Sequence, residues 1–282
     1  MSSYSEGVEG GCEGAASDRE PLAVIKIGGS ILTGTQAYRR AAAFVRNRLL
    51  AAPEERFVVV VSAQKGATDD LEEAARKIVA SPRKHALDLL WSTGELRSVA
   101  LLALHLQALD VHAVGVNIHQ TGLIAPHNGA TGAGGVRFDA KRLGELLGEC
   151  AVAVVPGFLA TDAAQAVVSL GRGGSDLTAV LLAAGLRANR CELIKDVPGY
   201  FTTDPHRDRS ALPVPFLTFE HALALADNGC DLVQRAALEA AARWDLPLVV
   251  RSLNEKATVS RIAGTIPGST WTDSVADLAV AP

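Results

Sequence analysis

The stretch Leu22-Ala23-Val24-Ile25-Lys26-Ile27-Gly28-Gly29-Ser30 places a short apolar run directly before two adjacent glycines. The run is rich in Val, Ile and Leu and does not alternate with polar residues, which is typical of a parallel strand covered on both faces. Adjacent glycines let the backbone turn sharply and bring N–H groups close to a phosphate. The stretch predicts a buried strand that ends in a phosphate-binding turn. The alternative is a plain strand-ending turn with a solvated lysine.

Five more apolar runs share this character, and Ala- and Leu-rich stretches separate them. The runs predict strands at Phe57–Ser62, His112–Val116, Ala151–Pro156, Glu192–Lys195 and Pro247–Arg251. The stretches between them predict helices at Tyr38–Ala51, Gly94–Leu109, Ser175–Leu186, Glu220–Asp227 and Leu232–Trp244. Because strand and helix alternate along the chain, the predicted fold class is α/β with a mainly parallel sheet. The Gly-, Ala- and His-rich stretch Asn117–Phe138 predicts a hairpin or flap.

The composition of the 282-residue chain is that of a soluble globular protein, with 48% hydrophobic and 21% charged residues. The net charge of −4 gives no reason to expect nucleic acid or an anionic membrane as a partner. No apolar run reaches the roughly 18 residues that a membrane span needs. Residues 1–20 are acidic, small and polar, so they predict a disordered tail rather than a secretory signal. Scattered cysteines fit free thiols in a reducing cytoplasm, the predicted location.

A second glycine-rich stretch, Leu170-Gly171-Arg172-Gly173-Gly174-Ser175-Asp176, opens an apolar helix. Three glycines before a helix N-terminus predict a site for an anion. Ser175 or Asp176 also fits a helix cap. Capping alone does not explain the arginine between the glycines. A guanidinium at this position can pair with a carboxylate through two hydrogen bonds, which favours a ligand-binding role.

The stretch Lys195-Asp196-Val197-Pro198-Gly199-Tyr200-Phe201-Thr202-Thr203-Asp204-Pro205 follows a predicted strand and contains a Pro-Gly turn. It therefore lies at the carboxyl edge of the predicted sheet, where open parallel sheets bind ligands. An ordinary surface turn is the alternative.

The stretch Ser92-Thr93-Gly94-Glu95 precedes the predicted helical run Leu96–Leu109. Its Ser-x-x-Glu pattern fits a capping box, in which Glu95 would bond to the backbone at the helix start. A contact between Glu95 and a ligand is the competing interpretation.

Together these segments resemble the aspartate kinases, within the wider amino acid kinase family, from about Ala23 to Thr265. Lys26–Ser30 stands where that family has Lys-Phe-Gly-Gly-Thr, and Leu170–Asp176 reproduces its Leu-Gly-Arg-Gly-Gly-Ser-Asp motif letter for letter. Further similar segments are Ser62-Ala63 with Thr68-Asp69, Ser92–Glu95 with Ser98, Asp196-Val197 with Thr202–Pro205, and Val250-Arg251-Ser252.

The resemblance implies the fold and the domain limits. It implies a three-layer α/β/α sandwich with a mainly parallel central sheet, the amino acid kinase fold, over residues 21–268. Residues 1–20 and 269–282 would be tails. We expect no regulatory ACT domain of the kind that typical aspartate kinases carry.

The resemblance also implies roles for single residues. Lys26 would bridge the ATP phosphates, and Asp176 would hold that lysine in place. Phosphate-binding groups would come from Gly28, Gly29, Ser30, Gly173 and Gly174. The acceptor would meet Thr68, Glu95, Arg172 and Ser175, with its amine on Glu95 and a carboxylate on Arg172. The nucleotide would be lined by Lys195, Asp196, Tyr200, Thr203, Asp204 and Pro205.

The implied reaction is ATP-dependent phosphorylation of a small amino acid carboxylate, L-aspartate to 4-phospho-L-aspartate. Mg²⁺ would arrive with ATP, and no protein side chain would bind the metal. A carboxylate nucleophile is already ionised at pH 7, so no general base is required. Two alternatives stay open: the same fold with another small acid or phosphate as acceptor, and a non-catalytic nucleotide- or oxyanion-binding homologue. We also expect a homo-oligomer, a dimer or larger.

Departures from the family pattern fall mainly on the nucleotide side. The family's Gly-Ala-Lys-Val-Leu-His-Pro segment reads Gly229-Cys230-Asp231-Leu232-Val233-Gln234-Arg235, so Asp231 stands in place of a lysine. Lys195 stands where the family has threonine. We expect another cation to face the polyphosphate instead, and Lys195 and Arg235 are the candidates. Lys195 is favoured because it lies at the ligand-binding edge of the predicted sheet.

Overall fold

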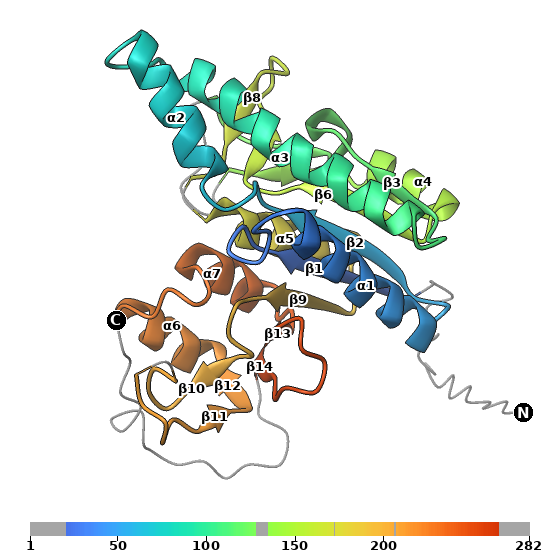
Figure 1. The fold of residues 1–282 in the computed structure, drawn as a ribbon, viewed down its shortest axis with the longest axis vertical. Helices are drawn as coiled ribbons and strands as arrows, with labels where there is room; N and C mark the ends of the chain where they lie inside the picture. The colour runs from blue at the N-terminus through green and yellow to red at the C-terminus, as the bar shows by residue number, and fades with distance from the viewer. Residues whose placement is uncertain (1–20, 128–134, 172, 206, 265–282) are drawn as a thin grey trace, which may run out of the picture.

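A computed structural model describes residues 21–127, 135–171, 173–205 and 207–264 of the chain. Its centre is an eight-stranded sheet (Figure 1). Only the β13–β14 pair is antiparallel among the described strands of this sheet. The strand order is β12 (Phe216–Thr218), β14 (Ser260–Ala263), β13 (Leu248–Arg251), β9 (Arg190–Ile194), β1 (Leu22–Ile27), β2 (Arg56–Val61), β6 (Val152–Pro156), β3 (Ala113–Gly115).

The register of the central strands brings several loops to one edge of the sheet. Ile27, the last residue of β1, pairs with Val61 of β2 on one side and with Ile194 of β9 on the other. All three strands run parallel, so their carboxyl ends are level. The segments that begin at Gly28, Ser62 and Lys195 therefore start side by side, at the edge where parallel sheets bind ligands.

Helices cover both faces of the sheet, and alternate strand residues point to opposite faces. One core cluster joins Ile25 and Val59 to Phe44 of α1 (Thr35–Ala51) and to Leu102 of α3 (Lys84–Gln107). The other joins Val24 and Val58 to α4 (Lys141–Glu149), α5 (Gly174–Leu186), α6 (Phe219–Asp227) and α7 (Arg235–Arg243). The predicted α/β class and three-layer α/β/α arrangement are confirmed.

Two smaller sheets lie beside the central one. The first has the order β5 (Arg137–Phe138), β4 (Leu123–Ile124), β7 (Leu159–Thr161), β8 (Val167–Ser169). Its β4 and β5 pair antiparallel, as the predicted hairpin requires, although residues 128–134 between them lie outside the described residues. A 3₁₀ turn, η1 (Ile118–Gln120), precedes β4. The second sheet is the antiparallel pair β10 (Tyr200–Phe201) and β11 (Pro213–Val214).

The predicted start of the helix Gly94–Leu109, which corresponds to α3, is wrong. Helix α3 begins at Lys84 rather than at Gly94, so Ser92–Glu95 lies in its middle and forms no capping box. The hydroxyl of Ser92 instead donates back to the carbonyl of Leu89, three residues earlier. Such local bonds are what serine makes inside a helix, and the same letters therefore fit two positions.

Other element limits differ by a few residues, and two helices were not predicted. Helix α7 begins at Arg235 rather than Leu232. Helix α2 (Ala67–Ile78) packs on α3, and α4 covers the second face. Both are mostly exposed, and each carries its apolar side chains on one face.

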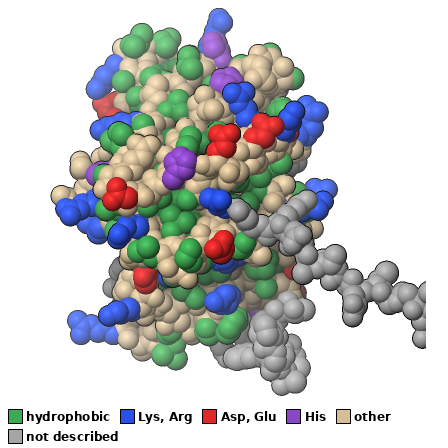
Figure 2. All heavy atoms as spheres, turned by 90° about the vertical axis from the view of Figure 1, so that its right-hand side faces the viewer, with side chains coloured by type: hydrophobic (Ala, Val, Ile, Leu, Met, Phe, Trp, Pro, Cys, Tyr) green, Lys and Arg blue, Asp and Glu red, His purple; other side chains and the backbone are tan. Residues whose placement is uncertain are grey.

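Side chains of both charges lie on the face of the molecule that Figure 2 shows. Figure 2 shows basic and acidic side chains interspersed on one face of the molecule, with hydrophobic side chains between them. Among the described helices, none combines the length and the apolar character of a membrane span. The predicted tails, 1–20 and 269–282, lie outside the described residues.

Candidate functional site

A buried carboxylate with two lysines lies at the carboxyl edge of the sheet. Asp176, in the first turn of α5, has a side chain that is only 4% exposed. The Nζ atom of Lys26 lies 2.8 Å from its Oδ1 atom, and the Nζ atom of Lys195 donates to its Oδ2 atom at 2.8 Å. Lys26 belongs to β1 and Lys195 follows the neighbouring strand β9. One carboxylate thus holds two ammonium groups, and the three charges sum to +1.

The two lysines keep this carboxylate ionised. Burial alone would raise the pKa of Asp176, but the charges of Lys26 and Lys195 outweigh it and lower that pKa to about 2. Burial lowers the pKa of Lys195, while the facing Asp176 carboxylate opposes that shift. Lys26, Lys195 and Asp176 therefore form a patch of net positive charge that is fixed against the sheet. Such a patch is suited to an anionic ligand.

The first glycine turn lies beside this patch. The N–H groups of Ile31 and Leu32 donate to the carbonyl of Gly28 and close the turn. Within the described residues, the N–H groups of Gly29 and Ser30 donate to no backbone carbonyl, so they are available to phosphate oxygens. A Cβ atom on Gly29 would lie 2.6 Å from the carbonyl oxygen of Ala63, which explains why only glycine fits there.

The second glycine turn leads into α5. Gly173 has a φ of 63°, and a Cβ atom there would overlap the Gln234 side chain that precedes α7. The hydroxyl of Ser62 donates to that of Ser175 at 3.0 Å, which ties the end of β2 to the helix start. Arg172, predicted to bind a substrate carboxylate, lies outside the described residues. Gly174 and Ser175 are buried in the first turn of α5.

A second buried carboxyl group, that of Glu95, lies on α3. The N–H of Ala63 donates to this carboxyl group, while its Oε2 atom has no hydrogen-bond partner in the described part of the chain. Burial raises the pKa of Glu95 to about 8, although the Ala63 hydrogen bond and the charge of Lys26 act against that rise. A buried and unpartnered oxygen of this kind calls for a donor from a ligand. Thr68 lies half-buried in the first turn of α2.

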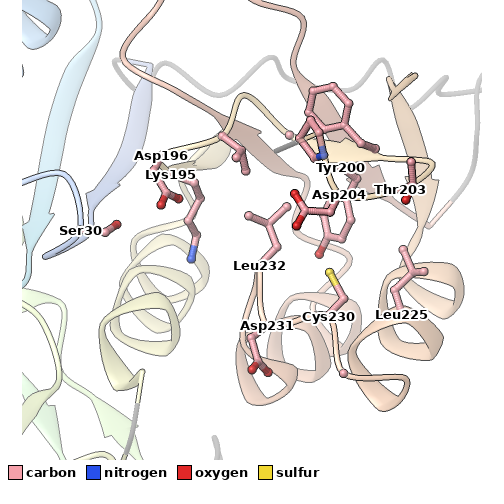
Figure 3. Close-up of a pocket in the computed structure, with 15 residues that line it drawn as sticks. Ser30, Lys195, Asp196, Tyr200, Thr203, Asp204, Leu225, Cys230, Asp231 and Leu232 are labelled. Atoms are coloured by element: carbon pink, nitrogen blue, oxygen red, sulfur yellow. The ribbon is translucent and has the colours of Figure 1, made fainter. Parts of the chain in front are cut away.

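A pocket of about 400 Å³ opens beside Lys195 (Figure 3). The six residues predicted to line the nucleotide all lie on its wall, as does Ser30 from the first glycine turn. In Figure 3, Lys195 lies between Ser30 on one side and Leu232 on the other. Asp231, from the loop between α6 and α7, lines the same pocket. The predicted phosphate turn and the predicted nucleotide residues thus meet at one cavity.

Sequence reasoning missed part of the wall. Leu225 supplies an apolar group that no motif indicated, and Cys230 and Leu232 extend this apolar side from the segment that the family pattern places on the nucleotide side. Leu225 belongs to the core pattern of α6, and only the chain turn at Gly229 brings the other two beside it. No cluster of three or more His, Cys, Asp or Glu side chains suited to a metal ion occurs among the described residues.

A family model described as the amino acid kinase family matches residues 21–252. The chain belongs to this family. This amino acid kinase is 38% identical to an aspartokinase of Geobacillus stearothermophilus over 204 residues, which make up 72% of this chain and 50% of that relative. The chain spans about half the length of the curated relatives it matches.

Solved structures place this amino acid kinase in the same group. The crystal structure of aspartate kinase from Synechocystis matches with a TM-score of 0.76 and 35% identity, covering 86% of this chain and 40% of that one. E. coli aspartokinase III, solved in complex with aspartate and ADP, matches with a TM-score of 0.72 and 25% identity. The match covers 88% of this chain and 65% of that one. The resemblance to aspartate kinases is confirmed.

Proposed function

We propose that this amino acid kinase transfers the γ-phosphoryl group of ATP to the side-chain carboxylate of L-aspartate and forms 4-phospho-L-aspartate. One observation carries the proposal: the lysine pair on Asp176 lies where the free N–H groups of the first glycine turn meet the pocket. The relatives are named aspartokinases, and one related structure was solved with aspartate and ADP.

The chemistry asks mainly for positioning and charge neutralisation. An oxygen of the acceptor carboxylate attacks the γ-phosphorus atom, the bond to the β,γ-bridging oxygen breaks, and ADP leaves with that electron pair. No proton moves. Lys26 and the N–H groups of Gly29 and Ser30 would stabilise charge on the transferred group. Mg²⁺ would enter as part of the MgATP substrate.

The acceptor would bind between α3 and the start of α5. The unpartnered Oε2 atom of Glu95 would receive the ammonium group of the amino acid. Arg172 would pair with its α-carboxylate, and Thr68 and Ser175 would complete the site, as the family motif implies. The ammonium group must meet an ionised Glu95, so acceptor binding would release the proton that burial keeps on this carboxyl group.

Two other functions remain as alternatives. The same phosphoryl-transfer machinery could serve a different small acid or a phosphate acceptor, because fold does not fix the acceptor. A non-catalytic nucleotide- or oxyanion-binding role is favoured by one observation, the acidic Asp231 on the wall of the pocket. A carboxylate there opposes a polyphosphate.

A coupled ADP-release assay with a panel of acids tests the proposal. L-Aspartate should give the highest kcat/KM, and hydroxylamine should trap the acyl phosphate as a hydroxamate. ADP release without hydroxamate would indicate a phosphate acceptor or ATP hydrolysis. Absence of turnover with tight nucleotide binding would support the non-catalytic role. Light scattering on the same sample tests the predicted homo-oligomer.

A further inference from the structure

We infer that Lys195 is a second phosphate-binding lysine, positioned by the same buried carboxylate that positions Lys26. This inference rests on the proposed function, because it names a residue that would act on ATP in the same site. It assigns to the end of β9 a charge that the family pattern places in the loop before α7.

The geometry fixes Lys195 at the border between the phosphate turn and the pocket. Its backbone N–H donates to the carbonyl of Arg251 at 2.8 Å, which anchors the residue to the sheet edge. Its side chain is 13% exposed, and it lines the pocket together with Ser30 (Figure 3). A polyphosphate that ran from this pocket to the first glycine turn would pass both lysines.

A purely structural role for Lys195 does not explain the arrangement. Asp176 already has one cation beside it, because the Nζ atom of Lys26 lies 2.8 Å from its Oδ1 atom. A second buried ammonium group costs desolvation free energy, and the burial that lowers the pKa of Lys195 expresses that cost. The net charge of +1 on the three groups leaves an attraction that a polyphosphate would use.

The other candidate cation is engaged elsewhere. Arg235, at the start of α7, forms ion pairs with Asp227 at the end of α6 and with Glu239 on α7. Among the described residues that line the pocket, Lys195 is the one lysine or arginine, and the acidic Asp231 is part of the same lining. Lys195 therefore supplies the cation that this pocket needs.

Calorimetric titration of MgATP and of AMP into five proteins tests the inference. The proteins are the parent, Lys195→Thr, Asp231→Lys, the double variant, and Lys77→Thr. Lys77 gives a matched control, since it is an exposed lysine on α2 whose partner is Glu73. Lys195→Thr should weaken MgATP binding by about tenfold or more, and AMP binding by no more than about twofold, because AMP lacks the β- and γ-phosphates. Asp231→Lys should restore part of the loss in the double variant, and Lys77→Thr should match the parent.

Failure of the inference and failure of the proposed function would give different results. Unchanged MgATP binding in Lys195→Thr overturns the inference while leaving the proposed function intact. An equal loss of AMP and MgATP shows a structural role and also overturns it. A sixth protein, Lys195→Arg, keeps the charge, so MgATP binding that is retained there and lost in Lys195→Thr supports the inference, whereas an equal loss in both variants counts against a role for the charge. A parent protein that binds no MgATP contradicts the proposed function itself.

Discussion

The proposed acceptor side and the proposed nucleotide side of the site are built from different kinds of structure. The acceptor side rests on regular elements, with Glu95 in the middle of α3 and Ser175 in the first turn of α5. The nucleotide side rests on loops, one after β9 that carries Lys195 and one before α7 that carries Asp231. The two departures that change the charge facing the nucleotide, Lys195 and Asp231, lie on these loops. A charge can move between two loops that share a cavity, whereas a group fixed inside a helix cannot be replaced from elsewhere.

The largest effect is expected where both sides meet, at Lys26. Lys26→Ala should reduce kcat by about a thousandfold or more, because in the proposed mechanism the lysine would stabilise charge on the transferred group in the transition state. Steady-state kinetics with saturating MgATP and L-aspartate measure the change. Circular dichroism must show a folded variant, since Lys195 still neutralises Asp176. Near-normal turnover in that folded protein contradicts the proposed mechanism.

The pH dependence of acceptor binding isolates the acceptor side. The pKa of Glu95 is raised to about 8, so its carboxyl group is protonated below that pH and cannot pair with an ammonium group. The acceptor KM should therefore rise as pH falls below about 8, by up to about tenfold per pH unit, while the MgATP KM stays nearly flat. Glu95→Gln should raise the acceptor KM and remove this slope. A parallel rise in both KM values would place Glu95 outside the acceptor site.

The same raised pKa has a consequence for stability without ligand. The ordinary pKa of glutamate is 4.5, so between about 4.5 and 8 the folded protein holds a proton on Glu95 that the unfolded chain has released. The free energy of unfolding should therefore fall as pH rises through this window and level off above it. Urea titrations of the parent and Glu95→Gln at several pH values measure the slope, which the variant should lose. A parent without this slope indicates that Glu95 is ionised throughout.

A smaller effect on both sides is expected at Gly29. Gly29→Ala places a Cβ atom 2.6 Å from the carbonyl of Ala63, so the phosphate turn and the Ala63 segment that bonds Glu95 must move apart. Such a displacement should reduce kcat/KM for both substrates by about tenfold. Gly148→Ala on α4 is the control, because a Cβ atom there meets no other atom within 4 Å. An effect on one substrate only shows that the two sides are not joined at this turn.

The smallest effect is expected at Ser62. Ser62→Ala removes the 3.0 Å hydrogen bond to Ser175 and should lower the free energy of unfolding by about 1 kcal/mol. Urea denaturation measures it. Thr93→Ala serves as a control, since Thr93 makes only a local bond on the exposed side of α3. A loss of acceptor binding much larger than the loss of stability shows that the Ser62 hydroxyl itself contacts the acceptor.

Six of the eight strands of the central sheet were predictable from their apolar runs, whereas β12 and β14, at one end of the sheet, were not predicted. Leu22–Ile27 was predicted with the limits that β1 has, since its run is apolar apart from Lys26 and ends at two glycines. The strands of the smaller sheets have two or three residues, too few to show a period of two. Ser92–Glu95 was misread because a capping box and a mid-helix segment share the same letters, and only packing against the rest of the fold separates them.

The site was predictable as separate motifs rather than as an arrangement. Family motifs indicated Lys26 and Asp176, and the loop after β9 was expected at the sheet edge. The contact of Lys195 with Asp176 joins residues far apart in sequence, and only the level ends of β1 and β9 bring it about. The unpartnered oxygen of Glu95 likewise depends on what α3 packs against. Neither follows from local sequence.

The position of Glu95 inside α3 would make the proposed acceptor site selective for the length of the substrate. Its backbone is held by helical hydrogen bonds on both sides, and Lys26 is held inside a strand of the central sheet. The span from amine receptor to phosphate cation therefore cannot adjust to a longer substrate. In an acid with one more methylene between its amine and its reacting carboxylate, the attacking oxygen would lie about 1 Å from its correct position relative to the γ-phosphorus atom. A misplacement of that size costs about a hundredfold in rate. Discrimination between homologous acids would come from stiffness rather than from any added contact.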